Sequence, residues 1–300
     1  SFLVDAAQPA TFGLTQPAQG IETKATTINF AWTASTDSSG IASYRLLVDN
    51  DPAFGSPAVD STFSAATLNT SAVVPPNDTY FWRVIAQDDA GNTRSAGDSS
   101  LLVDAAQPAA FALTQPAAGT ETKATTINFA WTASTDSSGI ASYRLLVDND
   151  PAFGTPAVDS TFSAATLNTT GVLQPNDTYF WRVVAQDDAG NTRVSGDSSF
   201  LVDAAQPAAF ALTQPAAGTE TSATTISFAW TASSDSSGIA SYRLLVDNDP
   251  AFVTPAVDST FSSATLNTTA VVPPNDTYYW RVIAQDDAGN TRVSGDSSFL

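Results

Sequence analysis

A stretch of 14 residues, TYFWRVIAQDDAGN, occurs three times in this chain and constrains its fold more than any other feature. It begins at Thr79, recurs at Thr178 with Val184 in place of the isoleucine, and returns at Thr277 with one phenylalanine replaced by tyrosine. Successive copies lie 99 residues apart, and the sequence between them repeats almost unchanged. A repeat of this length is typical of an array of domains, each large enough to fold alone. We therefore expect one fold, built three times.

Each copy of the stretch is predicted to form a long strand that ends in an acidic turn. In the first copy, Tyr80, Trp82 and Val84 alternate with the residues between them, and the turn 88–92 follows. Trp32 alternates in the same way in an earlier segment, so both tryptophans are expected to face the core. Turn residues separate six further strands in this unit, which are predicted at 10–16, 26–33, 43–48, 59–63, 66–73 and 94–104. The pattern predicts an all-β chain of three tandem seven-stranded sandwiches.

The segment from Val74 to Tyr80, followed by Trp82 and Gly91, resembles the fibronectin type III pattern, as do Trp32 and Tyr44 in the preceding strands. In that pattern a tyrosine at a corner precedes a long alternating strand and a glycine turn. The resemblance implies fibronectin type III-like sandwiches joined into an extended rod. It extends to immunoglobulin-like repeats of bacterial surface proteins and of secreted carbohydrate-active enzymes. The Arg-Gly-Asp cell-binding loop of some relatives is absent, so that role is not implied.

The repeat divides the chain into units joined by short proline-flanked linkers. Residues 1–7 are predicted to be the end of a preceding repeat with its linker. The three sandwiches are then predicted at 8–104, 105–203 and 204–300. The linkers are too short to act as free tethers, so we expect the units to bend little. We expect the segment to come from a longer array.

The charge of the chain limits its partners. There are 11 basic and 30 acidic residues, which gives a net charge of −19. Such a charge repels nucleic acids and anionic membranes, and it favours either solubility or cation binding. No apolar run is long enough to form a membrane-spanning helix, so direct membrane insertion is not expected. With the family resemblance, these features predict an extracellular or cell-surface protein of a prokaryote.

The residue types that are missing argue against catalysis. Cysteine, histidine and methionine are absent, so the chain lacks thiol nucleophiles and histidine bases. The remaining candidates, the adjacent pair Asp88 and Asp89, lie on an exposed turn and point in different directions. We predict that the segment is not an enzyme.

Oxygen-rich turns are predicted to meet at the junctions between units. The resemblance places two turns of the second unit at the pole where the linker enters, and it places a loop of the first unit opposite them. Carboxylate and amide oxygens suit Ca²⁺, and a glycine permits tight wrapping. The alternative is that Asp, Asn and Gly serve only the turns. The predicted calcium ligands are Asp104, Asp136, Asp187, Asp188 and Asn191, with Asp49 and Asp51 from the first unit.

The outward face of two neighbouring strands is a predicted contact surface. It carries Arg45 and Leu47 on one strand and Phe81, Arg83 and Ile85 on the other. An exposed apolar patch with two cations could meet another copy of the array or a partner bearing carboxylates. The alternative is that the arginine stems cover the apolar side chains.

Six asparagines lie in glycosylation sequons. They occur at two positions in each unit, and the first unit's second asparagine is also suited to its turn. The candidates are Asn69, Asn77, Asn168, Asn176, Asn267 and Asn275.

These observations predict a structural repeat segment of an extracellular stalk or filament, stiffened by calcium at its junctions and associating laterally with other copies of itself. The alternative is a set of spacer modules in an adhesin or in a secreted carbohydrate-active enzyme. The same turns, strands and linkers fit both, because sandwiches of this kind serve many roles.

Overall fold

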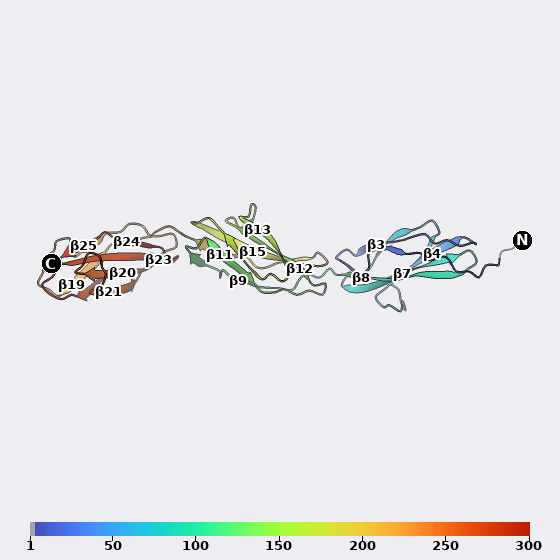
Figure 1. Ribbon diagram of the computed structural model, residues 1–300, viewed down its shortest axis with the longest axis horizontal. Helices are drawn as coiled ribbons and strands as arrows, with labels where there is room; N and C mark the ends of the chain where they lie inside the picture. The colour runs from blue at the N-terminus through green and yellow to red at the C-terminus, as the bar shows by residue number, and fades with distance from the viewer. Residues whose placement is uncertain (1–3) are drawn as a thin grey trace.

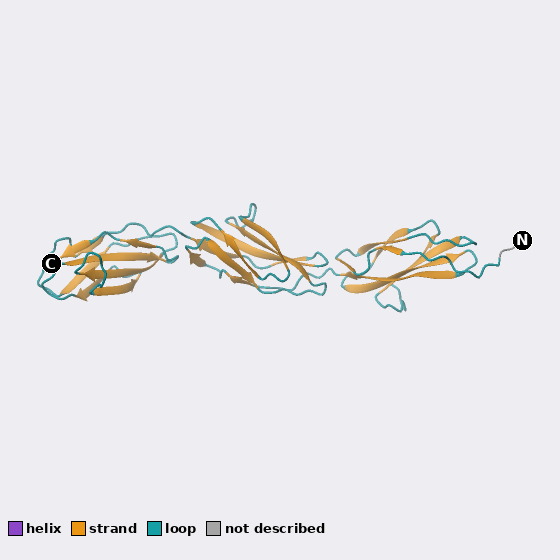
Figure 2. Ribbon diagram, in the orientation of Figure 1, coloured by secondary structure: helices purple, strands orange, loops and turns teal. Residues whose placement is uncertain are grey.

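The computed structural model describes residues 4–300, and Figure 2 shows strands joined by turns and loops throughout. The first three residues of the predicted leading segment 1–7 lie outside the described part. The three units follow one another end to end, with the two chain ends at opposite ends of the molecule (Figure 1). Within residues 4–300 the structure contains no helix that is long and apolar enough to cross a membrane.

The first unit contains eight strands. They are β1 (Leu14–Gln16), β2 (Ile21–Thr23), β3 (Thr27–Trp32), β4 (Ile41–Asp49), β5 (Val59–Ser64), β6 (Asn69–Val73), β7 (Asp78–Asp88) and β8 (Thr93–Val103). Two sheets result, with strand orders β1-β3-β6 and β2-β8-β7-β4-β5. The long strand β7, which carries the first copy of the repeated stretch, lies in the middle of the larger sheet.

The other two units repeat this arrangement. In the second unit the sheets have the orders β9-β11-β14 and β10-β17-β15-β12-β13, with β16 also paired to β15. In the third they are β18-β19-β22 and β21-β20-β23-β24, with β25 also paired to β23. The strands of the second unit are β9 (Leu113–Gln115), β10 (Thr120–Thr122), β11 (Thr126–Trp131), β12 (Ile140–Asp148), β13 (Val158–Ser163), β14 (Asn168–Val172), β15 (Asp177–Asp187), β16 (Thr192–Val194) and β17 (Ser198–Val202). Those of the third are β18 (Leu212–Gln214), β19 (Thr225–Trp230), β20 (Ile239–Asp247), β21 (Val257–Ser262), β22 (Asn267–Val271), β23 (Tyr278–Asp286), β24 (Thr291–Val293) and β25 (Ser297–Phe299).

An aromatic core lies between the two sheets of each unit, as the alternation predicts. Trp82 is fully buried and meets Phe30 edge to face, with ring centroids 5.1 Å apart. Trp32 packs against Tyr44 from the facing sheet at 5.8 Å. Both tryptophans therefore serve the core, where side chains of this size bury the most apolar surface.

A tyrosine fixes the corner that leads into the long strand. Tyr80 Oη donates a hydrogen bond to Pro75 O at 3.0 Å, and Tyr179 Oη donates to Gln174 O at 3.1 Å. This bond, from a tyrosine near the start of a strand to the backbone a few residues upstream, is the tyrosine corner of immunoglobulin-like sandwiches. Together with the two-sheet topology, it confirms the predicted fibronectin type III-like fold.

Two features of the fold differ from the seven predicted strands. The first is β2, which pairs in parallel with β8 because the chain changes sheet after β1. The turn that follows Pro17 and includes Gly20, with φ of 71°, makes this change possible.

The second difference is the break in the last strand of the later units. In the second unit, Ser195 lies in the gap between β16 and β17. Its hydroxyl accepts a hydrogen bond from Val183 N of β15 at 3.0 Å. The first unit has Ala96 at the position of Ser195, and there β8 runs without a break.

Candidate functional site at the unit junctions

Asp104 lies where the first two units meet. Its N–H donates to Thr23 O of the first unit at 2.9 Å, and its own carbonyl accepts from Asn191 Nδ2 of the second unit at 2.9 Å. The next N–H along the linker, from Ala105, donates to Asn77 Oδ1 of the first unit at 2.8 Å. Because consecutive groups of the linker are bonded to opposite units, the linker here is held rather than free. The second junction repeats the three bonds at 2.8–2.9 Å through Asp203, Ala204, Thr122, Asn176 and Asn290.

Three of the seven predicted metal ligands come together at this point. Asp104 comes from the linker, Asp136 from the turn between β11 and β12, and Asp187 from the end of β15. One carboxylate oxygen of each lies within 4.8 Å of the others. Asp104 and Asp187 are 0% and 1% exposed, and Asp136 is half-buried. The same group recurs in the first unit as Asp5, Asp37 and Asp88, and in the third as Asp203, Asp235 and Asp286.

Hydrogen bonds hold the two turn aspartates in place. Asp136 Oδ1 accepts from Ser138 N and from Ser138 Oγ, both at 3.0 Å. Asp187 accepts from Asn191 twice, at Oδ1 from the backbone N–H at 2.7 Å and at Oδ2 from the side-chain amide at 3.0 Å. Asn191 thus bonds to Asp187 and to the carbonyl of Asp104, which makes it a support for the carboxylate group.

Asp104 stays charged despite its burial. Burial raises the pKa of this carboxyl, but the hydrogen bonds that it accepts from Ser137 Oγ and Ala106 N outweigh that effect, so its pKa lies below the usual range. The ionised form is favoured because both bonds are donated to the carboxylate. A buried negative charge is therefore present at neutral pH.

Glu22 of the first unit adds a further carboxylate across the junction. Burial raises its pKa, and the charges of Asp188, Asp104 and Asp187 raise it further. Its Oε2 atom is buried and has no hydrogen-bond partner among residues 4–300. Glu121 stands in the same surroundings at the second junction. The sequence analysis did not assign these glutamates to the site.

A lysine spans each junction. Lys24 Nζ of the first unit donates to Gly190 O of the second at 2.8 Å, and Lys123 Nζ donates to Gly289 O at 2.9 Å. The third unit has Ser222 at this position. These contacts were also missed, although the sequence Glu-Thr-Lys at matching positions of the first two units is the signal that could have indicated them.

The predicted ligand Asp188 lies beside the group of three rather than within it. Its carboxylate lies over Gly139, where a Cβ atom would be 2.9 Å from Asp188 Oδ2. Gly139 also has φ of 89°, a conformation that favours glycine. This close approach packs the two turns of the second unit against each other.

Asp49 and Asp51 do not join the carboxylate group. Asp49 is buried and accepts hydrogen bonds within its own loop, from Asp51 N at 3.3 Å and from Ser56 N at 3.1 Å. Asp51 is exposed and accepts from Ala53 N at 2.9 Å. In the structure both side chains stabilise the loop between β4 and β5.

The two arginines of the predicted contact surface are already paired within the unit. Arg45 forms two parallel bonds to Asp60, each 2.6 Å long. Arg83 binds Asp98 at 2.7 Å, and its guanidinium lies 4.0 Å above the ring of Phe54. The same pairs and stacking recur in the other two units. Neither Arg45 nor Arg83 is left without a carboxylate.

The apolar residues of that surface are less exposed than an adhesive patch requires. Leu47 is only 7% exposed, and Phe81 and Ile85 are half-buried. The expectation of an exposed apolar patch is therefore wrong for Leu47. That the arginine stems cover these apolar side chains, the alternative considered from the sequence, stays a prediction.

The six sequon asparagines are exposed. Asn77 adopts φ of 66° and uses its Oδ1 atom to hold the linker, so it also has a structural role. Glycosylation at these positions stays a prediction.

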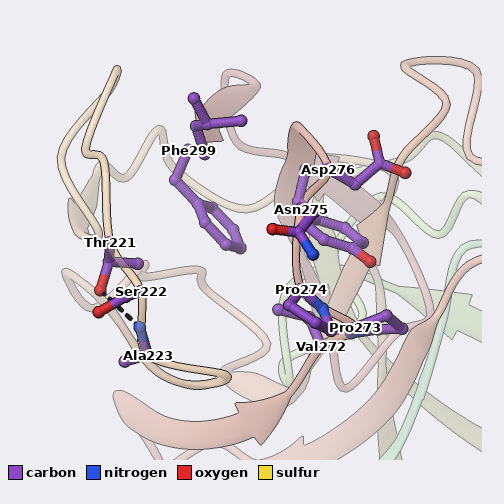
Figure 3. Close-up of a pocket in the computed structure, with 11 residues that line it drawn as sticks. Thr221, Ser222, Ala223, Val272, Pro273, Pro274, Asn275, Asp276 and Phe299 are labelled. Atoms are coloured by element: carbon purple, nitrogen blue, oxygen red, sulfur yellow. Dashed lines mark hydrogen bonds between the residues drawn. The ribbon is translucent and has the colours of Figure 1, made fainter.

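Figure 3 shows a pocket at the far end of the third unit, with a volume of about 130 Å³. Phe299 lies on one side of it and Pro273 and Pro274 lie on another (Figure 3). In the first two units Val103 and Val202 follow the position of Phe299 by two residues and are fully buried. At the matching ends of the first two units these valines belong to the core clusters.

Comparison with known proteins finds relatives among polysaccharide-degrading enzymes. No protein-family model matches the chain. The chain is 29% identical over 186 residues to Chitinase A1 of Niallia circulans, a match that covers 61% of this chain and 24% of that protein. It is 36% identical over 135 residues to Exoglucanase A of Cellulomonas fimi, which covers 41% of this chain and 14% of that protein. The chain thus spans at most about a quarter of these relatives.

Solved structures similar to the chain include fibronectin type III domains. Domains FN1–FN3 of chicken CNTN1 match 97% of this chain and 97% of theirs, with 15% identity and a TM-score of 0.37. The fibronectin(III)-like modules of Clostridium thermocellum CbhA match 64% of this chain and 94% of theirs, with 17% identity and a TM-score of 0.43.

Proposed function

We propose that this chain is a stiff, non-catalytic spacer in an extracellular bacterial protein that acts on polysaccharides. The observation that carries the proposal is the pair of linker aspartates, Asp104 and Asp203, each hydrogen-bonded to the units on both sides. A linker held in this way transmits the orientation of one unit to the next. The two bacterial relatives, named as a chitinase and an exoglucanase, support a setting in polysaccharide degradation.

The spacer function is favoured over a self-associating filament by the surface of the large sheet. A filament needs a face that pairs with another copy, and the face considered for this role has Leu47 buried and its arginines paired internally. Strong negative charge also opposes close approach of two copies. A solitary spacer needs neither an adhesive face nor charge complementarity.

The near-identity of the units also favours a stiff rod. Both junctions contain the same bonds, from the linker aspartate, the preceding asparagine and the following unit's asparagine, so both are expected to adopt the same angle. A repeated angle and rise produce a regular rod of predictable reach. Such a rod would hold a catalytic or binding domain at a fixed distance from its anchor.

Small-angle X-ray scattering on the 300-residue chain tests the rod. We expect a pair-distance distribution with a long linear tail, as for a stiff rod, and one that is unchanged over a tenfold range of concentration. A distribution typical of freely jointed domains would contradict a stiff spacer. Dimers or fibres in analytical ultracentrifugation would favour the filament instead.

The polysaccharide setting needs a second measurement. The chain alone is expected to remain in the supernatant when it is mixed with insoluble chitin or cellulose, and to release no sugar from either. Co-sedimentation would instead make it a binding module, and release of sugar would make it a catalytic one.

A further inference from the structure

We propose that each unit binds one Ca²⁺ ion between its linker aspartate and its two acidic turns. In the second unit the ligands are Asp104, Asp136 and Asp187, and in the third they are Asp203, Asp235 and Asp286. The first unit offers Asp5, Asp37 and Asp88 in the same way. The binding of the ion does not depend on the polysaccharide setting proposed above.

In the third unit a buried carboxylate oxygen without a hydrogen-bond partner points to the ion, whereas the matching oxygens of Asp88 and Asp187 accept from asparagine side chains. Asp286 is 1% exposed, and its Oδ2 atom has no hydrogen-bond donor among residues 4–300. Its other oxygen, Oδ1, accepts from Asn290 N at 2.7 Å. A buried charged oxygen left without a donor is strongly unfavourable unless a cation or water supplies the missing contact. Asp286 belongs to the group of three, so a cation bound there would contact it.

The charges around the group are unbalanced. At the second junction Glu121 and Asp287 add their carboxylates to the three ligands. The nearby cation Lys123 uses its Nζ to donate to a carbonyl, Gly289 O. Asp203 is fully buried, so its charge is not screened by solvent. One divalent cation would offset part of this excess.

The donor set favours calcium. Cysteine and histidine, the preferred ligands of zinc, are absent from the sequence. Ca²⁺ contacts oxygen at about 2.3–2.6 Å, so two of its ligands can be up to about 5 Å apart, whereas the shorter contacts of Mg²⁺, about 2.1 Å, limit them to about 4.2 Å. The oxygens in each group lie within 4.8 Å of one another, a separation that Ca²⁺ can bridge. Water would complete the six to eight ligands that Ca²⁺ takes.

A bound ion would tie the linker to the following unit. Asp104 is the residue whose N–H is bonded to the first unit, and its carboxylate would contact the same ion as the two turns of the second unit. Calcium would thereby stabilise the second unit and also restrict the angle at the first junction.

Calorimetric titration of the chelator-treated chain with CaCl₂ tests the proposal. We expect three Ca²⁺ per chain, two for Asp136→Asn, and none for the triple variant that also carries Asp37→Asn and Asp235→Asn. Asn keeps the oxygen that accepts from Ser138 N while the charge is removed. The matched control is Asp150→Asn, which removes an equal charge from an exposed loop residue outside the group and should leave three sites.

Thermal unfolding separates ion binding from a merely structural role. In chelator, the triple variant should unfold at the same temperature as the natural sequence or above it, because repulsion among the carboxylates is relieved. In 5 mM CaCl₂ the order should reverse, because only the natural sequence gains the ion. A triple variant that unfolds earlier under both conditions by the same amount would show a structural role only and would overturn the site.

Three further outcomes would contradict the proposal. One is the absence of any calcium-dependent heat up to about 10 mM, well above the dissociation constants of about 10⁻⁴–10⁻³ M found in extracellular modules. Another is an unchanged stoichiometry in Asp136→Asn. The third is binding of MgCl₂ as tight as that of CaCl₂, which would overturn the assignment to calcium. Scattering and co-sedimentation, which test the spacer, are not needed to decide any of these.

Discussion

Leu101 is a single residue at which the first core differs from the other two. The later units have Phe200 and Phe299 at this position, and Phe200 contacts the rings of Phe129 and Tyr179 at centroid distances of 5.9 and 6.0 Å. Leu101 occupies the same buried position without a ring, so these contacts are absent from the first core. The first unit is therefore expected to be the least stable of the three.

Leu101→Phe should stabilise the first unit by about 0.5–1.5 kcal/mol, the range for an added aromatic pair. Hydrogen exchange read by mass spectrometry should show slower exchange in β7 and β8 and no change in the other units. Phe200→Leu is the matched control and should speed exchange in β15 and β17. Faster exchange in β8 of Leu101→Phe would mean that the first core cannot accommodate the ring without strain.

Asp60 is the residue from which a pH dependence can be derived. Its hydrogen bonds to Arg45 hold the pKa of this carboxyl below its ordinary value of 3.8. A lowered pKa in the folded state means that the pair stabilises the fold above pH 3.8 and that this contribution is lost as the pH falls through the lowered pKa. The pair is about half exposed, so we expect a small effect.

Asp60→Asn should lower the urea midpoint at pH 6 and have a progressively smaller effect as the pH falls through the lowered pKa and the natural carboxyl is protonated. The difference between the two proteins should shrink below pH 4. The control is Asp51→Asn, which changes an exposed loop aspartate that accepts from a backbone N–H instead of an arginine. Its difference in urea midpoint from the natural sequence should not shrink in the same way as the pH falls. A difference that stays undiminished as the pH falls would indicate that Asp60 acts through packing instead of charge.

At the scale of the strands, the alternation of Tyr80, Trp82 and Val84 predicts correctly which face of β7 is buried. The strand β2 was not predicted, because three residues carry no periodicity and its partner β8 is 80 residues away. The convergence of Asp104 with Asp136 and Asp187 was anticipated only through the family resemblance, which placed the turns at one pole. Glu22 and Lys24 were missed because their partners lie in the next unit, 166 residues along the chain for Lys24, and the repeated Glu-Thr-Lys does not by itself say what it contacts.

The contact between the two acidic turns depends on Gly139. Gly139→Ala would place a Cβ atom 2.9 Å from Asp188 Oδ2 and would impose a φ of 89° on a residue that avoids it. We expect a loss of about 1–3 kcal/mol in the stability of the second unit. Urea unfolding of the whole chain, with Gly154→Ala as control, measures it, since the space around Gly154 is open. Equal midpoints for the two variants would show that the turn adapts without strain.

At the scale of the whole molecule, a lysine bonds across each junction. Exchanging it with the serine at the matching position of another unit would remove this contact without changing the net charge of the chain. Lys123 Nζ donates to Gly289 O in the following unit, and Ser222 occupies the matching position of the third unit. A hydrogen bond of this kind contributes about 0.5–1.5 kcal/mol, which corresponds to a change of about two- to tenfold in the population of the docked junction. Removal of the lysine should therefore loosen one junction and leave the three sandwiches intact.

The double variant Lys123→Ser with Ser222→Lys retains the net charge of the chain and is the sharpest form of this test. Distances between spin labels placed in the second and third units should broaden in Lys123→Ser and in the double variant alike, whereas the distribution between the first and second units, still linked by Lys24, should not change. If the double variant instead kept the narrow distribution of the natural sequence, the total charge and not the contact with Gly289 would control the junction. A broadening confined to the second junction would mean that the stiffness of the rod is set separately at each junction, so that an array of such units could be made flexible at a chosen point by one residue.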